Sequence, residues 1–133
     1  MDAVAMAAAV ADHRPAVTLS HKPEKAAVAA ALAEAWEPVP DLLVELVSRR
    51  PAGQRILGFA AQSGDVLPQA QAKFARKGCD LLFANPIDQA AAGFASATNQ
   101  GWLLGPGEAV EHLEPMGKLP LAHRLLTALG ALI

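Results

Sequence analysis

Residues 58–85 read GFAAQSGDVLPQAQAKFARKGCDLLFAN, and this stretch decides the fold class. It opens at the end of an apolar segment, continues through an amphipathic segment, Asp65–Lys77, and ends in a second apolar segment, Leu81–Ala84. Pro68 is tolerated in the first turn of a helix, and Gly78 stands where a cap glycine commonly ends one. The stretch therefore predicts a strand–helix–strand unit.

Lys73 and Lys77 lie four residues apart, so they share one face of the expected helix. Two cations beside a loop of small residues suit a ligand that carries phosphate. An ordinary solvated helix face has the same spacing, so the spacing leaves both interpretations open.

The rest of the chain alternates in the same manner. The expected strands are Val4–Ala11, Arg55–Ala61, Leu81–Ala84, Gly101–Leu104 and Ala109–Leu113. The expected helices are Asp41–Ser48, Asp65–Lys77 and a C-terminal amphipathic helix marked by Leu121, Leu125, Leu129 and Leu132. The expected loops are His13–Lys25 and Pro86–Ala97. Strands that alternate with helices predict an α/β fold with a mostly parallel sheet.

Two segments remain ambiguous at the level of sequence. Val4–Ala11 has the continuous apolar character of a strand buried on both faces, but its alanines also suit a helix. Ala26–Trp36 fits helix and strand equally well. Ligands of parallel α/β sheets bind at the carboxyl ends of the strands, which directs attention to Asp12, Ala60–Ser63 and Asn85.

Composition limits the class of protein. The 133 residues suit one domain, carry a net charge of −2 and contain no basic tract, so nucleic-acid binding is not expected. No apolar run reaches the length of a membrane span. Cys79 is the single cysteine, which excludes an internal disulfide and favours a reduced, cytoplasmic setting. Its place beside a buried strand favours a structural thiol over a nucleophile.

A set of motifs appears in order along nearly the whole chain. They are Ala8-Ala9-Val10-Ala11-Asp12-His13-Arg14-Pro15, His21-Lys22, Pro40-Asp41-Leu42-Leu43, Gly58-Phe59-Ala60-Ala61, Lys73 with Lys77, Asp80, and Ala84-Asn85. This ordered set resembles phosphopantothenate–cysteine ligase, the synthetase half of the bifunctional coenzyme A biosynthesis flavoprotein. The resemblance implies a Rossmann-like sheet with flanking helices, in which residues 1–133 are the C-terminal portion of a single ligase domain.

The resemblance also implies a reaction. The family joins 4′-phosphopantothenate to cysteine, and its bacterial members use CTP through an acyl-cytidylate intermediate. The expected partners are therefore CTP, 4′-phosphopantothenate, cysteine and a second copy of the chain, since the family acts as a homodimer. Mg²⁺ is implied by the triphosphate chemistry, and FMN is expected only if a decarboxylase domain precedes this chain.

Site residues follow from the resemblance position by position. The implied nucleotide contacts are Met6, Ala7, Ala8, Asp12, Lys22, Pro40, Asp41, Leu42, Leu43, Phe59, Lys73 and Lys77. Lys22 is also the implied catalytic residue, because it would reach the triphosphate from the loop. Asn85 fits a turn as well as a site.

The chain departs from the family pattern in three places. The family domain begins with a strand, a Gly-rich turn and an Asn-bearing Ser-Ser-Gly segment before the strand that here starts at Val4. Lys22-Pro23-Glu24-Lys25 has one cation fewer than the family's usual loop, and Gln62 replaces a usual Glu. The first departure supports a second hypothesis: a non-catalytic nucleotide-binding or oligomerisation fragment of the same domain.

Overall fold

The computed structural model describes residues 1–16, 36–88 and 96–133. These residues form two compact units, one made of Met1–Ala7 with Leu43–Ile133 and the other of Ala8–Leu42. Within the described residues, no helix is both long and apolar enough to cross a membrane.

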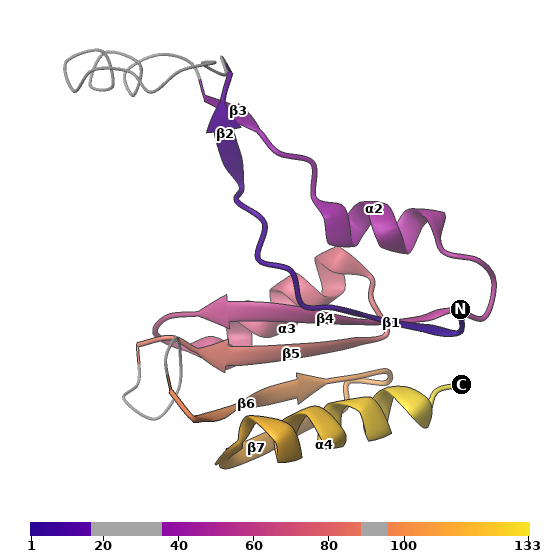
Figure 1. Ribbon diagram of the computed structural model, residues 1–133, viewed down its shortest axis with the longest axis vertical. Helices are drawn as coiled ribbons and strands as arrows, with labels where there is room; N and C mark the ends of the chain where they lie inside the picture. Colours follow the sequence, from indigo (N-terminus) through magenta and orange to yellow (C-terminus); the bar gives the residue numbers. More distant parts are fainter. Residues whose placement is uncertain (17–35, 89–95) are drawn as a thin grey trace. The chain divides into compact units, whose positions relative to one another are not determined.

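A five-stranded sheet forms the centre of the larger unit (Figure 1). In spatial order its strands are β1 (Ala3–Met6), β4 (Arg55–Gln62), β5 (Leu81–Pro86), β6 (Thr98–Leu104) and β7 (Val110–Gly117). The first three strands are parallel, and β6 and β7 are added antiparallel. The mixed, Rossmann-like α/β sheet confirms the fold class expected from the sequence.

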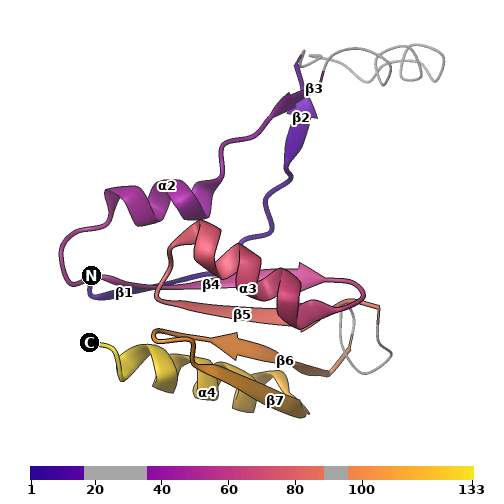
Figure 2. The ribbon, with the colours of Figure 1, turned by 180° about the vertical axis from the view of Figure 1, so that it is seen from behind.

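Helices cover both faces of this sheet, as the two opposite views show (Figures 1 and 2). On one face α2 (Leu42–Arg49) and α3 (Val66–Lys77) pack on the sheet, and α4 (Lys118–Gly130) packs on the other. The core below α2 and α3 contains Leu43, Ile56, Ala60, Val66, Ala70, Cys79, Leu82, Ala84 and Leu104. The core below α4 contains Leu57, Leu81, Phe83, Leu103, Leu113, Leu121, Leu125 and Leu129.

The strand–helix–strand prediction for residues 58–85 is confirmed. Asp65 has the extended backbone of an N-cap residue, and α3 begins at the next residue. Gly78 ends the helix in the left-handed conformation at φ 67°, and its N–H donates to the carbonyl of Phe74 over 3.1 Å. Arg76 and Lys77 occupy the last turn, where cations oppose the negative end of the helix dipole.

The first strand is shorter than predicted. The sequence suggested Val4–Ala11, but β1 ends at Met6, which pairs with Gly58 of β4, and the residues after it are exposed. The expectation of burial on both faces is also wrong, because Ala5 is exposed and its neighbours are half-buried. Among the described residues β1 is an edge strand, so one side of it lacks a neighbour.

Part of an expected loop forms a β-ribbon instead. In the smaller unit β2 (His13–Pro15) pairs antiparallel with β3 (Trp36–Pro38), and Arg14 bonds Glu37 over 2.5 Å. The rest of the predicted loop, and Ala26–Trp36 up to residue 35, lie outside the described residues. In the second expected loop, Pro86 still belongs to β5, and residues 89–95 are not described.

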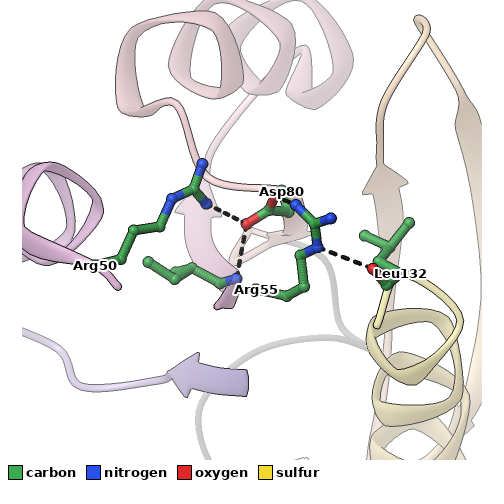
Figure 3. Close-up of polar contacts among 5 residues, drawn as sticks. Arg50, Arg55, Asp80 and Leu132 are labelled. Atoms are coloured by element: carbon green, nitrogen blue, oxygen red, sulfur yellow. Dashed lines mark hydrogen bonds and ion pairs between the residues drawn. The ribbon is translucent and has the colours of Figure 1, made fainter. Parts of the chain in front are cut away.

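The Asp80 carboxylate joins four segments of the larger unit (Figure 3). It accepts hydrogen bonds from Arg50, from Arg55 Nη1 at 3.2 Å and from the backbone N–H of Ile56 at 2.8 Å. Arg55 Nε in turn donates to the carbonyl of Leu132 over 2.9 Å. Asp80 is one-tenth exposed, so these donors replace most of the water that the charge would otherwise bind.

Replacing Asp80 with Ala should lower the free energy of unfolding by about 2–3 kcal/mol, because it leaves two partly buried arginines without their carboxylate. Equilibrium urea denaturation measures this change. Glu111→Ala is the matched control, since Glu111 also pairs with an arginine, Arg124, but at half-exposed positions. That loss should stay within about 1 kcal/mol. Equal losses in the two variants would contradict the central role of Asp80.

A second prediction concerns Gly101, where a Cβ would lie 2.2 Å from the carbonyl oxygen of Ala84. Because a strand backbone cannot move aside cheaply, Gly101→Ala should cost about 2–3 kcal/mol. Gly130→Ala is the control, since a Cβ there meets nothing within 4 Å and alanine favours helix. Thermal unfolding should show a lower Tm for the first variant, and an unchanged or higher Tm for the second. An unchanged Tm for Gly101→Ala would disprove the close approach.

Candidate functional site

Gly58 is the point where two predicted site residues, Met6 and Leu43, meet. A Cβ on Gly58 would lie 2.7 Å from Leu43 Cδ2 and 3.3 Å from Cys79 Sγ, so the missing side chain lets the start of α2 rest on the sheet. Met6 pairs with Gly58 from the adjacent strand, and its side chain packs against the same core. Met6 and Leu43, which the resemblance implied as nucleotide contacts, are thus brought together on the α2/α3 face.

The two lysines of α3 belong to the same face. Val47 of α2 approaches Gly78, since a Cβ on that glycine would lie 3.6 Å from Val47 Cγ1. The end of α3, which carries Lys77, therefore lies beside α2, and Lys73 lies one turn earlier. Both lysines are half-buried. We call Met6 and Leu43, which meet at Gly58, together with Lys73 and Lys77 of the neighbouring helix α3, the Gly58 cluster.

The Gly58 cluster is not at the strand edge that the sequence suggested. The helix α3 starts after the carboxyl end of β4 and ends just before the amino end of β5. Over 12 residues it travels about 18 Å, so Lys77 lies at the opposite edge of the sheet from Gln62 and Asn85. The cations in the second half of α3 therefore lie toward the amino edge of the sheet, and their contact with a nucleotide stays a prediction.

Phe59 points to the other face of the sheet. Its ring meets Phe83 edge to face with centroids 6.2 Å apart, and the residue is 36% exposed. It lines a cavity of about 300 Å³ between the sheet and α4. The lining residues are Ala5, Leu57, Phe59, Phe83, Asn85, Asn99, Lys118, Leu121, Ala122, Leu125 and Leu126. The sheet thus separates Phe59 from Lys73 and Lys77 within one chain.

Asn99 and Lys118 are polar residues of this cavity that the sequence did not single out. Neither belongs to a recognisable motif, and only the pairing of β5 with β6 and the packing of α4 bring them to Asn85. Asn85 lies in strand β5 rather than in a turn, lines the cavity, and donates from Nδ2 to the carbonyl of Pro86 over 3.3 Å; its role in a site stays a prediction.

The remaining predicted contacts lie in the smaller unit or at its border. Ala7 ends the segment that belongs to the larger unit, and Ala8, Asp12, Pro40, Asp41 and Leu42 belong to the smaller one, where all five are exposed. The carbonyl of Asp12 accepts the N–H of Val39 over 2.9 Å, which brings Asp12 close to Pro40. Lys22, the implied catalytic residue, lies outside the described residues.

The carboxyl edge of β4 contains a buried amide without a partner. Gln62 is 7% exposed, and its Nε2 has no hydrogen-bond acceptor among the residues that the structure describes. Nearby, Asp88 accepts the N–H of Gly64 over 2.7 Å, which ties together the loops after β4 and β5. The resemblance implies a Glu at position 62, and a buried carboxylate there would need a hydrogen-bond donor. Gln62 in its place removes one negative charge from the carboxyl edge of the sheet.

Cys79 is a buried thiol of the core. Burial raises the pKa of the Cys79 thiol, partly opposed by a hydrogen bond from the Gly58 backbone, so the thiol stays protonated at neutral pH and acts as a core residue. Residues 1–16, 36–88 and 96–133 contain no group of three or more His, Cys, Asp or Glu side chains placed to hold a metal ion.

Comparison with known proteins defines the family. Residues 1–132 match the model of the DNA/pantothenate metabolism flavoprotein C-terminal domain. The coenzyme A biosynthesis bifunctional protein CoaBC of Mycobacterium tuberculosis is 38% identical over 96% of the chain, and that of Bacillus subtilis is 34% identical over 98%. The chain spans 32% of the length of each of these relatives.

A solved structure agrees with these sequence matches. The C-terminal domain of a coenzyme A biosynthesis bifunctional protein CoaBC superposes with a TM-score of 0.70 at 26% identity, and the match covers 98% of this chain and 56% of that one. The family model and the mycobacterial identity both extend over nearly every residue of the chain. The chain belongs to the family of DNA/pantothenate metabolism flavoprotein C-terminal domains.

Proposed function

We propose that this chain is the nucleotide-binding portion of a ligase domain that joins 4′-phosphopantothenate to cysteine at the expense of CTP, in coenzyme A biosynthesis. The Gly58 cluster is the observation that carries the proposal. It groups Lys73 and Lys77 of α3 on the sheet face that α2 also covers, where Val47 of α2 approaches the end of α3. Membership of a family whose relatives are named for coenzyme A biosynthesis supports the substrate class.

The charge distribution supports an anionic ligand at this place. The chain has a net charge of −2, yet α3 has no acidic residue in its first turn and carries three cations in its second half. A triphosphate would bring several negative charges against Lys73 and Lys77. Each charge-assisted hydrogen bond to phosphate contributes about 1.5–3 kcal/mol.

The proposed reaction has two steps. The carboxylate of 4′-phosphopantothenate attacks the α-phosphate of CTP, which forms the acyl-cytidylate and releases pyrophosphate. The cysteine amine then attacks the acyl carbon, which forms the amide and releases CMP. Cations that face the triphosphate favour the first step because negative charge builds on the departing pyrophosphate. We assign this role to Lys22 together with the lysines of α3.

The proposal also includes Mg²⁺, a homodimer and a cytoplasmic location. Mg²⁺ commonly binds through substrate phosphates and only one or two carboxylates, so a dedicated acidic cluster is not required, and its natural place would be on the triphosphate. The resemblance implies that Asp12 contacts the nucleotide and names no metal ligand. We derive no step from the metal. A reduced, buried Cys79 is consistent with the cytoplasm.

A second function remains a candidate because the chain matches only 56% of the similar C-terminal domain structure. In that case the chain binds the nucleotide, or helps to assemble the domain, without turnover. Both functions share the Gly58 cluster, and they differ in whether CMP and pyrophosphate are released.

Titration of CTP into the chain tests the shared site. Lys73→Ala should weaken binding by about tenfold, since it removes one charge-assisted contact. Arg76→Ala is the matched control, because Arg76 is an exposed cation of the same helix. Isothermal titration calorimetry with CTP and with ATP measures both variants and the base preference. Equal affinities for wild type and Lys73→Ala would refute the Gly58 cluster as the phosphate site.

Release of CMP and pyrophosphate from CTP, phosphopantothenate and cysteine separates the two functions. We expect no turnover from residues 1–133, but turnover when they are fused to the part of a relative's domain that the resemblance places before them. Turnover by the chain on its own would rule out the non-catalytic function. A fusion that binds CTP but releases no CMP would contradict the ligase assignment.

A further inference from the structure

Helix α2 has a thin attachment to the sheet. Leu43 is its buried residue and lies on Gly58 of β4, while Leu46 and Val47 are half-buried against the same core. The helix has eight residues, and short helices depend on tertiary contacts because their own hydrogen bonds are marginal in water. The position of α2 therefore depends strongly on what holds its two ends.

Arg50 holds the far end of α2 to the sheet. It follows the helix directly and donates from Nη1 to Asp80 Oδ2, and the Asp80 side chain is only 10% exposed (Figure 3). The same oxygen accepts the backbone N–H of Ile56 at 2.8 Å, so strand β4 fixes the carboxylate. Pro51 comes next and disfavours helical backbone at Arg50, which stops α2 there. The sheet thus fixes Asp80, and Asp80 fixes the end of α2.

We propose that Arg50 is a positioning residue of the nucleotide site: through Asp80 it keeps α2 packed on the sheet, with Leu43 on Gly58 and Val47 beside the end of α3. Leu43 precedes Arg50 by seven residues, about 10 Å along a helix, so movement at one end is transmitted to the other. The inference rests on the proposed function, in which the Gly58 cluster contacts CTP. Arg50 itself is assigned no contact with the nucleotide.

The contact at the other end of α2 tolerates little movement. A Cβ on Gly58 would lie 2.7 Å from Leu43 Cδ2 and 3.3 Å from Cys79 Sγ, so Leu43 packs directly on strand backbone. A gap of about 0.5–1 Å already loses a quarter to a half of such a dispersion contact. Met6 pairs with Gly58 from the adjacent strand, so a displaced Leu43 also leaves the neighbourhood of Met6.

Loss of Arg50 acts on affinity through the fraction of molecules in which α2 is packed. Without the ion pair, α2 exchanges between the packed position and positions in which Leu43 leaves Gly58. A nucleotide that binds only the packed arrangement then has an apparent affinity reduced by that fraction. If α2 is packed in about one molecule in ten, CTP binds about tenfold more weakly.

Two other arginines separate positioning from charge and from stability. Arg49 stands at the same end of α2 with the same charge, but it pairs with Glu45 within the helix and its side chain is 77% exposed. Arg55 binds the same Asp80 carboxylate from β4 at 3.2 Å, and its Nε donates to the carbonyl of Leu132. Removal of Arg49 therefore tests charge alone, and removal of Arg55 weakens the Asp80 contacts without releasing α2.

Calorimetric titration of CTP into residues 1–133 tests the inference, at a temperature well below the Tm of every variant. Arg50→Ala should weaken CTP binding by about tenfold, although it touches no ligand. Arg50→Lys keeps the charge that faces Asp80 and should recover most of the lost affinity. Arg49→Ala and Arg55→Ala should each change the affinity by less than about twofold.

Hydrogen exchange supplies a readout that a loss of overall stability would not produce. In Arg50→Ala the amides of α2 should exchange faster than in wild type, while those of α4 should not change. Saturating CTP should slow the α2 amides of this variant again, because the nucleotide selects molecules in which the helix is packed. Unchanged exchange of α2 in Arg50→Ala would overturn the inference.

The titrations also distinguish this inference from the proposed function. If wild type binds CTP and Arg50→Ala binds it equally well, the positioning role is wrong and the proposed nucleotide site stands. Equal weakening by Arg49→Ala would assign the effect to charge, and equal weakening by Arg55→Ala would assign it to lost stability; either result overturns the positioning role. A wild type that binds no CTP would refute the Gly58 cluster as the nucleotide site, and the positioning role with it.

Discussion

The larger unit depends on one buried carboxylate. Asp80 stands just before β5, and it binds Arg50 at the end of α2, Arg55 at the start of β4, and the N–H of Ile56. Arg55 extends the contact to Leu132, just beyond α4. A single charge thus sets the register between the sheet and the helices on both of its faces. A buried charge is costly unless its lone pairs are satisfied, and here several donors converge on it.

The Gly58 cluster depends on this constraint. Arg50 follows α2 directly, so the ion pair to Asp80 fixes the end of the helix, while Leu43 fixes its start against Gly58. The same Asp80 follows α3 by three residues, which sets the position of Lys77. The predicted phosphate contacts are therefore positioned by a group at the amino edge of the sheet, rather than by the strand ends where α/β proteins usually hold their ligands.

The sequence predicted α3 and its flanking strands because the signals there are local: Pro68 permits the first turn, and Gly78 alone suits the left-handed cap. It failed where the determinants are distant. The ribbon of β2 and β3 joins residues 21 to 25 apart in sequence through three pairs, two of which contain proline. The shortness of β1 likewise reflects its place at the edge, which no local pattern reveals.

The same distinction between local and distant determinants applies to the candidate site. The residue types of the Gly58 cluster were recognised from ordered motifs, but the separation of Phe59 from Lys73 by the sheet follows from strand alternation and the side on which α3 packs. Asn99 and Lys118 had no sequence signal, since tertiary packing alone brings them to Asn85. The sequence predicted which residue types could contact a nucleotide, whereas the assignment of each residue to a face of the sheet required the structure.

The hydrogen bond from Arg55 to Leu132 affects how the chain folds while it is being translated. Its partners are 77 residues apart, and α4 immediately precedes the acceptor. On the ribosome, the face below α2 and α3 can assemble once β5 and β6 have emerged, because its core ends at Leu104. The α4 face must wait until translation has passed residue 132. A nascent chain therefore exposes Leu57, Leu81 and Phe83 during that interval, which is when a chaperone would be needed.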